Sequence, residues 1–209
     1  MKKEIERFAK LFRGLDKAYG AVDIAHGPNG TKQQGRYKFV QEERTLETFE
    51  AHLEGKTSIG IVPINEDNKC VWGAIDIDTY PLDHTAIVKK IEKLKFPLVL
   101  CRSKSGGGHI YLFMKNFVPA EKIQSKLKEL TAELGYAANT EVFPKQIKLV
   151  LERGDNGNFL NIPYFDHEGG LRYAIKSDGS AATLEEFLDM AEGSAITEEE
   201  LEALLTEDV

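Results

Sequence analysis

The apolar positions of the chain follow two periods, and each period predicts one kind of element. Apolar residues three and four positions apart mark one face of an α-helix. This spacing predicts amphipathic helices at residues 3–15, 45–53, 84–95 and 119–134. Two acid-rich helices are expected near the end of the chain. Each begins with a capping box, a threonine followed three positions later by a glutamate: Thr183 with Glu186, and Thr197 with Glu200.

Short apolar or alternating runs predict β-strands between these helices. The expected strands cover residues 36–41, 58–64, 69–79, 98–102, 109–114 and 171–176. A polar turn at 65–68 separates two of them, so we expect 58–64 and 69–79 to pair as a hairpin. Glycines and a proline at 27–30 indicate a loop.

The composition is that of an ordinary soluble globular protein, with 42% hydrophobic and 29% charged residues among 209. No apolar run approaches the about 18 residues that a membrane helix needs, and the first residues lack the apolar core of a signal peptide. We therefore expect a cytoplasmic protein without membrane contact. Cys70 and Cys101 both lie in predicted strands, which favours reduced core thiols. Without paired cysteines or His-x-x-x-His spacing, a zinc knuckle or ribbon is excluded.

The charge is distributed unevenly. The net charge is −7, but residues 183–209 hold ten acidic and no basic residues, so residues 1–182 carry a net charge of +3. A mildly basic body can make local phosphate contacts, whereas the overall charge argues against tight, non-specific binding of duplex DNA.

Two aspartates, Asp76 and Asp78, stand one residue apart at the end of the predicted strand 69–79. Side chains alternate between the faces of a strand, so both carboxylates share one face and Ile75 and Ile77 the other. Like charges this close oppose folding unless a cation neutralises them, and Mg²⁺ or Mn²⁺ prefers such oxygen ligands. The alternative is a strand end with merely solvated acids. The apolar run before them favours a central strand that ends in a cleft.

A glycine-rich loop at 103–108 joins the predicted strands 98–102 and 109–114. Its three glycines allow the backbone to approach a ligand closely, and the adjoining Lys104 and His109 are donors suited to an anion. The Gly-Lys-Ser/Thr sequence of a Walker loop is absent. The alternative is a flexible hairpin turn, which would not need these two side chains beside it.

Four segments stand in a characteristic order: residues 74–78, 103–109, 141–146 and 157–163. This ordered set resembles the catalytic domain of the archaeo-eukaryotic primase superfamily, the primase-polymerases. It is most similar to the branch found in phages and in the TOTE conflict systems, a similarity that residues 12–14 and 52–63 share. The resemblance covers roughly residues 8–165.

The resemblance implies an α/β (α+β) fold, in which helices flank a mixed sheet. A recognition-motif-like half would pack against an N-terminal subdomain. We expect the catalytic domain at residues 1–176, with 1–60 contributing to the N-terminal subdomain, and an acidic helical tail at 177–209.

The resemblance also implies a site. The motif that binds two divalent metal ions in the family matches Asp76 and Asp78, and Glu141 is the candidate for the third acid. A Ser/Gly-rich turn that leads to a triphosphate-contacting histidine matches Ser105 and His109. The implied catalytic residues are Asp76, Asp78, His109 and Glu141, and the implied nucleotide-binding residues are Ser103, Lys104, Ser105, Gly107, His109, Lys145 and Asn158. The implied cofactor is Mg²⁺ or Mn²⁺ in a two-metal site, without zinc.

The leading hypothesis is therefore a DNA primase or polymerase, a nucleotidyltransferase that makes or extends primers on single-stranded DNA in phage or mobile-element replication. Its partners would be the template, an NTP or dNTP, and a separate helicase or single-strand-binding protein. Two alternatives stay open: a metal-dependent nuclease or phosphohydrolase using the same acids, and a non-catalytic nucleic-acid-binding accessory domain.

The acidic tail has two interpretations. Its helices could cover the body, as amphipathic helices commonly do, or they could form a detachable segment that binds a partner or screens DNA from the site. The apolar residues on which both interpretations depend are Leu184, Phe187, Leu188, Leu201, Leu204 and Leu205.

Overall fold

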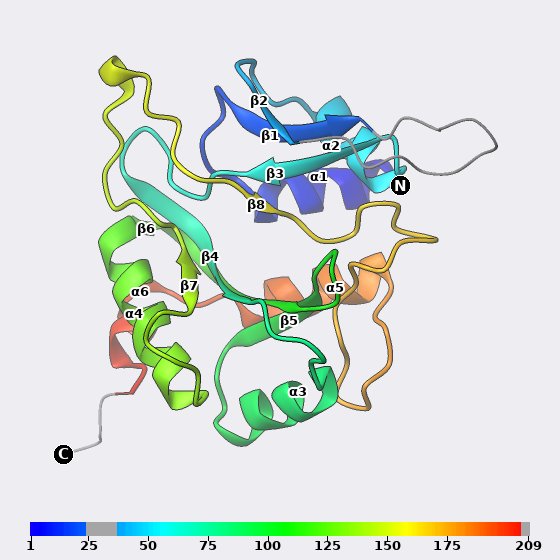
Figure 1. Cartoon of the computed structure of the whole chain (residues 1–209), viewed down its shortest axis with the longest axis vertical. Helices are drawn as coiled ribbons and strands as arrows, with labels where there is room; N and C mark the ends of the chain where they lie inside the picture. Colours follow the sequence, from blue (N-terminus) through cyan, green and yellow to red (C-terminus); the bar gives the residue numbers. More distant parts are fainter. Residues whose placement is uncertain (24–36, 206–209) are drawn as a thin grey trace.

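The computed structural model describes residues 1–23 and 37–205, which form two four-stranded sheets with helices around them (Figure 1). The predicted loop at 27–30 lies outside the described residues. The first sheet has the order β2 (Lys38–Val40), β1 (Tyr19–Asp23), β3 (Thr57–Ile61), β8 (Leu160–Asn161). The second has the order β5 (Leu98–Arg102), β6 (Gly108–Pro119), β4 (Lys69–Ile77), β7 (Glu141–Phe143). All paired strands in these sheets are antiparallel.

The helices are α1 (Lys2–Leu11), α2 (Leu46–Leu53), α3 (His84–Lys93), α4 (Ala120–Glu133), α5 (Leu184–Ser194) and α6 (Glu198–Ala203), with a 3₁₀ turn, η2, at Leu151–Arg153. Helix α2 packs on the first sheet and on α1, whereas α3 and α4 pack on the second sheet. Helix α5 contacts α1, β5 and β6, and α6 contacts α4. The expected α/β fold with flanking helices is therefore present, with its strands divided between two sheets (Figure 1).

Two hydrophobic cores follow from this arrangement. One lies between the second sheet and helices α3 and α4, and it includes Ile75, Ile110 and Leu127. The other fills the space between the two sheets and helices α1, α2 and α5, with Trp72 and Tyr111 fully buried. Because strand side chains alternate, the same strands supply both cores. Both cysteines are buried and free, as predicted.

The hairpin prediction is wrong. Strand β3 pairs with β1 and β8, whereas β4 pairs with β6 and β7, so the two strands belong to different sheets. The turn at 65–68 is present, with Asn65 bonded to the backbone nitrogens of Asp67 and Lys69. The chain therefore turns where the sequence indicates, but it crosses to the second sheet instead of pairing back.

Two further element predictions need correction. The strand expected at 171–176 is absent, because this segment makes only isolated bridges, Cys101 with Ala174 and Ile175 with Ala181. The first helix ends at Leu11 and does not continue to residue 15. Beyond it, the chain bonds instead to neighbouring segments: the indole nitrogen of Trp72 donates to the carbonyl oxygen of Arg13 at 2.9 Å.

The acidic C-terminal helices pack on the body. Arg7 on α1 forms ion pairs with Asp189 at 2.6 Å and Glu192 at 2.9 Å, and Lys122 on α4 forms pairs with Glu198 and Glu202. The buried apolar residues of these helices are Leu184, Phe187, Leu188, Ala191 and Leu201. In the structure the acidic helices therefore cover the body, as the first of the two interpretations expected.

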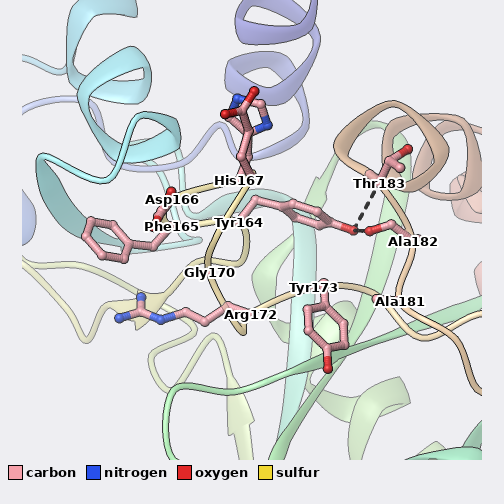
Figure 2. Close-up of a pocket in the computed structure, with 11 residues that line it drawn as sticks. Tyr164, Phe165, Asp166, His167, Gly170, Arg172, Tyr173, Ala181, Ala182 and Thr183 are labelled. Carbon is pink, nitrogen blue, oxygen red and sulfur yellow. Dashed lines mark hydrogen bonds between the residues drawn. The ribbon is translucent and has the colours of Figure 1, made fainter.

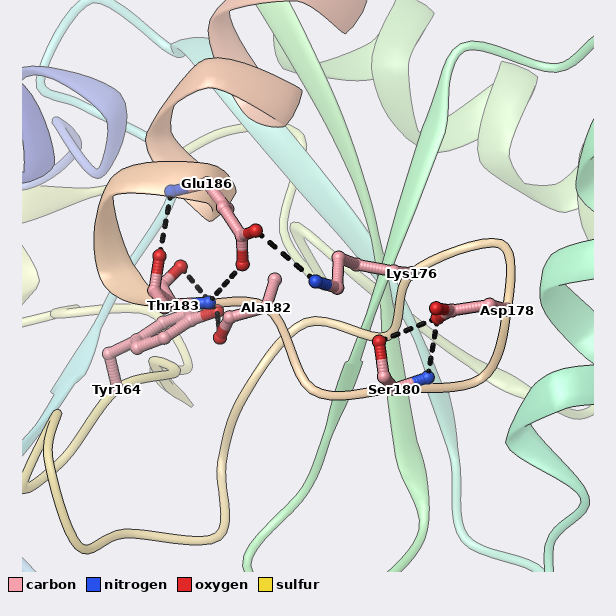
Figure 3. Close-up of polar contacts among 7 residues, drawn as sticks. All are labelled: Tyr164, Lys176, Asp178, Ser180, Ala182, Thr183 and Glu186. Atoms are coloured by element: carbon pink, nitrogen blue, oxygen red, sulfur yellow. Dashed lines mark hydrogen bonds and ion pairs between the residues drawn. The ribbon is translucent and has the colours of Figure 1, made fainter.

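The start of α5 shows both hydrogen bonds of the predicted capping box (Figure 3). The hydroxyl of Thr183 accepts from the backbone nitrogen of Glu186 at 3.2 Å, and the Glu186 carboxylate accepts from the backbone nitrogen of Thr183 at 2.8 Å. Lys176 donates to the same carboxylate at 3.2 Å and so ties the helix to the preceding segment. No helix in the described parts of the chain is long and apolar enough to cross a membrane.

Candidate active site

A row of three polar side chains crosses strands β6, β4 and β7 near the C-terminal end of β4. Strand β4 lies between β6 and β7, and its Asp76 stands directly opposite His109 on one side and Glu141 on the other. Directly opposed residues of antiparallel strands point to the same face. The row therefore gathers on one face two acids and a histidine that are far apart in the sequence.

The acids line one open pocket of about 360 Å³. Its lining residues are Asp76, Ile77, Asp78, Thr79, Tyr136, Asn139, Thr140 and Glu141. Asp78 lies just beyond the end of β4 and is exposed, whereas Asp76 is partly buried. The strand end thus opens into a cavity with three carboxylates and no lysine or arginine among its lining residues.

His109 is held in place by both ring nitrogens. It is only 8% exposed, its Nε2 lies 3.4 Å from Oδ1 of Asp76, and its Nδ1 is hydrogen-bonded to the hydroxyl of Tyr111 at 3.2 Å. Burial raises the pKa of Tyr111 well above its usual value, so this hydroxyl keeps its proton. In the tautomer whose Nδ1 accepts from this hydroxyl, the imidazole proton is on Nε2, the nitrogen beside Asp76.

The glycine-rich loop is a tight turn that packs against the end of β4. The backbone nitrogen of Ser103 donates to the carbonyl oxygen of Gly107 at 3.0 Å. A β-carbon at Gly107 would lie 2.3 Å from the carbonyl oxygen of Ile77, so only glycine permits this approach. The loop predicted to bind an anion therefore lies directly beside the end of the strand that carries the acids.

Two residues that the sequence did not single out fasten this loop. The hydroxyl of Tyr80 donates to the carboxylate of Asp78 and is also hydrogen-bonded to Ser105, and Asp78 raises the pKa of Tyr80. The Nε2 of His84 donates to the carbonyl oxygen of Gly107 at 2.9 Å. Neither residue belongs to a motif, and their only signal in the sequence is that they follow the acids within six positions.

The other predicted nucleotide-binding residues lie around this centre at different places. The Nζ of Lys145 is 2.9 Å from Glu141 and lies over the ring of Phe143. The Nζ of Lys104 lies 5.7 Å from the ring centroid of Tyr37. Asn158 forms hydrogen bonds with the side chain of Gln146. Of these three residues, Lys145 contacts one of the acids, Glu141, whereas Lys104 contacts Tyr37 and Asn158 contacts Gln146.

The donor set suits a divalent cation in its chemistry. Asp76, Asp78 and Glu141 offer carboxylate oxygens to one cavity, which is the ligand type that Mg²⁺ and Mn²⁺ prefer. Among the described residues, however, no three His, Cys, Asp or Glu side chains lie close enough together to hold a metal ion. Glu141 is instead paired with Lys145, so this ion pair competes with a metal for the third carboxylate.

Comparisons with known proteins identify a family for this chain. Residues 26–172 match the family described as the archaeo-eukaryotic primase domain of the TOTE conflict system. A comparison with curated proteins finds no match.

Two solved structures show a weak likeness. The AEP domain (PP-N190) of the Cyanophage S-2L primase-polymerase is 12% identical, with a TM-score of 0.45, and 91% of this chain and 98% of that chain are covered. The catalytic domain of primase Repb′, in complex with initiator DNA, is 11% identical, with a TM-score of 0.40 and 92% of each chain covered. The family match extends over more than half of the chain, and it includes the row of polar residues and the glycine-rich loop. The chain therefore belongs to the archaeo-eukaryotic primase domain family of the TOTE conflict system.

Proposed function

We propose that this protein is a DNA primase-polymerase, which joins nucleotides to a growing strand on a single-stranded DNA template. The observation that carries the proposal is the convergence of Asp76, Asp78 and Glu141 on one pocket, beside an anion-binding type of loop, in a chain of the primase family. Nucleotidyl transfer needs this combination, because the protein has to position two negatively charged reactants and stabilise the charge that develops.

The three acids would hold Mg²⁺ or Mn²⁺. When bound, the metal ions neutralise the phosphates and activate the 3′-hydroxyl oxygen. Asp76 is fixed because its strand is paired on both sides at this position, and Asp78 by its bond to Tyr80. Glu141 would be the adjustable ligand, because its ion pair with Lys145 has to open before the carboxylate can contact a cation.

The remaining residues would position the nucleoside triphosphate. His109, held by Tyr111, has its Nε2 beside Asp76, and from there this nitrogen would donate a hydrogen bond to a phosphate oxygen. The hydroxyls of Ser103 and Ser105 supply further donors from the tight turn. Charge-assisted hydrogen bonds of this kind are shorter and stronger than neutral ones.

The test is primer synthesis on circular single-stranded DNA that lacks a primer, with labelled nucleotides and Mg²⁺ or Mn²⁺. We expect product from the wild-type protein and none from the double variant Asp76→Asn, Asp78→Asn. Asp67→Asn is the matched control, because Asp67 is an exposed aspartate in the turn at 65–68. Product that appears only with an annealed primer would indicate a polymerase without initiation activity.

Release of nucleotides from labelled DNA without added triphosphates would instead indicate the nuclease alternative. Metal-independent DNA binding without turnover would indicate an accessory domain. Undiminished primer synthesis by the double variant would show that the proposed acids are not the catalytic ones.

A further inference from the structure

Two buried arginines of this protein have very different surroundings. The side chain of Arg44 is 3% exposed and forms an ion pair with Asp16 at 2.7 Å. Arg172 is 7% exposed, yet within the described residues it forms no ion pair with a carboxylate. A buried charge is costly unless it is paired, so the unpaired guanidinium needs an explanation.

The contacts of Arg172 are with neutral groups. Its Nη1 donates to the hydroxyl of Ser58 at 2.9 Å, its Nη2 donates to the hydroxyl of Tyr37 at 3.4 Å, and its guanidinium lies 5.2 Å from the ring centroid of Phe165. Figure 2 shows the side chain extending toward Phe165 and away from Tyr173. These contacts fix the direction of the guanidinium without neutralising its charge.

A second cation approaches the same tyrosine. The Nζ of Lys104, in the glycine-rich loop, lies 5.7 Å from the ring centroid of Tyr37. Tyr37 is only partly buried, so part of its side chain reaches the surface. Arg172 also lines a pocket of about 290 Å³ with Asp166 and Glu168, but neither acid pairs with it. Two positive charges thus flank one neutral ring, a pattern that favours an anion.

An unpaired acceptor lies on the same side of the first sheet. The Oδ1 of Asn161 is buried and has no hydrogen-bond partner among the described residues. Asn161 stands opposite Gly60 in the β3–β8 pair, and Ser58, which contacts Arg172, lies two residues before Gly60 and so on the same face. Buried acceptors are nearly always satisfied, so this oxygen points to a ligand with a donor group.

This side of the sheet also carries an aromatic surface. The ring of Phe159 lies against Gly20 and Gly60, where a β-carbon would come within 2.6 and 2.3 Å of it. Tyr37 and Phe39 pack against the same ring, with centroids 5.8 and 5.1 Å away. The cationic group and the unpaired amide oxygen thus occur together with a platform of the kind on which a nucleobase can stack.

The charge of Arg172 also reaches the row of polar residues. Burial is the main reason for the raised pKa of Tyr111, while Asp76 raises it further and Arg172 opposes the shift. Tyr111 in turn bonds to His109. Arg172 therefore acts against the raised pKa of a tyrosine that contacts the proposed catalytic histidine.

We propose that Arg172, with Lys104 and Tyr37, forms a phosphate-binding subsite, and that Asn161 accepts a hydrogen bond from the sugar or base of the same nucleotide unit. This inference rests on the proposed function and extends it to Arg172 and Tyr37, which lie outside the four motif segments, and to Asn161 in the first sheet. The phosphate belongs either to the nucleoside triphosphate or to the backbone of single-stranded DNA, and both sources share the same chemistry.

The test measures binding with EDTA present, so that the acidic pocket and its cation do not contribute. Calorimetry on the full chain would use inorganic tripolyphosphate, a nucleoside triphosphate and a short single-stranded oligonucleotide as separate probes. We expect Arg172→Met to weaken at least one nucleotide probe about 10- to 100-fold, as loss of a charged hydrogen bond does. Arg44→Met is the matched control, which should lower the melting temperature and leave every affinity unchanged.

The probes identify the source of the phosphate. A loss confined to tripolyphosphate and the nucleoside triphosphate assigns the subsite to the incoming nucleotide, and a loss confined to the oligonucleotide assigns it to the template. Asn161→Ala should weaken the nucleotide probe several-fold without affecting tripolyphosphate, which has no donor for the amide oxygen. Wild-type affinity of Arg172→Met for every probe would overturn the proposal.

A second variant and a parallel activity assay complete the test. If Arg172→Met does not fold, Arg172→Lys keeps the charge but loses the planar fork, and we expect several-fold weaker binding from it. Unchanged binding by that variant would also count against the subsite. Primer synthesis, assayed in parallel on the wild-type protein, separates the two ideas: absent synthesis with Arg172-dependent binding refutes only the proposed function.

Discussion

The two faces of the second sheet differ although the same strands build them. On one face, Ile75 and Ile77 of β4 pack beneath α3 and α4 in a dry core. On the other face, Ala74 lies in the core between the sheets, and Asp76, two residues further on, reaches an open pocket. The comparison shows that the site begins where one face of the strand loses its cover while the opposite face stays buried. The core face therefore gives the acids their rigid support.

The largest expected effect on activity comes from a substitution on the polar face of β4. Asp76→Asn keeps the shape of the side chain and removes its charge. We expect primer synthesis to fall by at least about 100-fold, because a metal ligand contributes several kcal/mol to transition-state stabilisation. The unfolding midpoint in urea should stay within error of the wild-type value or rise. A variant that loses activity only because it unfolds would contradict this assignment.

The apolar face should respond in the opposite way. Ile75→Ala removes a fully buried side chain from the core beneath α3 and α4, and we expect a loss of about 2–5 kcal/mol in the free energy of unfolding. At a temperature where the variant is folded, its affinity for Mn²⁺ should match that of the wild type. Urea denaturation and metal titration on the same sample test both statements. A much weaker affinity would mean that Ile75 positions the acids more directly than we infer.

The stability of the fold should fall at acidic pH because of a buried histidine, His52. His52 is fully buried, donates from Nε2 to the carbonyl oxygen of Pro163 and accepts at Nδ1 from the backbone nitrogen of Ile59, and burial lowers its pKa to about 3. Because the unfolded chain binds this proton at higher pH, the contribution to stability is complete above the unfolded pKa of about 6.5 and is lost as pH falls toward 3.

Between pH 6.5 and 5 we expect this single group to remove about 1.5 kcal/mol of stability. The difference in urea stability between the wild type and His52→Gln, measured across this range, isolates the effect from other titrating groups. The variant should be less stable overall but should show a shallower pH dependence. Parallel curves for the two proteins would exclude His52 as the source.

The smallest expected effect concerns the ion pair at the edge of the pocket. Lys145→Met frees the Glu141 carboxylate from its partner at 2.9 Å. Exposed ion pairs contribute little, so we expect Mn²⁺ to bind only about two- to fivefold more tightly. Lys148→Met, which changes a nearby exposed lysine, is the control. Weaker metal binding by Lys145→Met would mean that the lysine supports the site instead of competing for the acid.

The sequence alone determined most of the local structure. The strand predicted at 98–102 is β5 with the same bounds, and the helix expected at 45–53 is α2 after its threonine cap. Such features depend on periodicity and on capping residues within a few positions, which one sequence displays directly. The alternation along a single strand also predicted that Asp76 and Asp78 share one face, and in the structure both residues line one pocket.

Which strands became neighbours depends on the packing of the whole chain. The hairpin expected from the turn at 65–68 does not form, and Asp76 instead lies between His109 and Glu141. Arg172 finds Ser58 and Tyr37 across 114 and 135 positions of sequence. Such contacts follow from how the apolar faces of the sheets and helices are buried together, and no local pattern encodes that choice. The acids and the glycine-rich loop were thus predictable from the sequence, whereas the packing of the sheets determined which residues lie opposite Asp76.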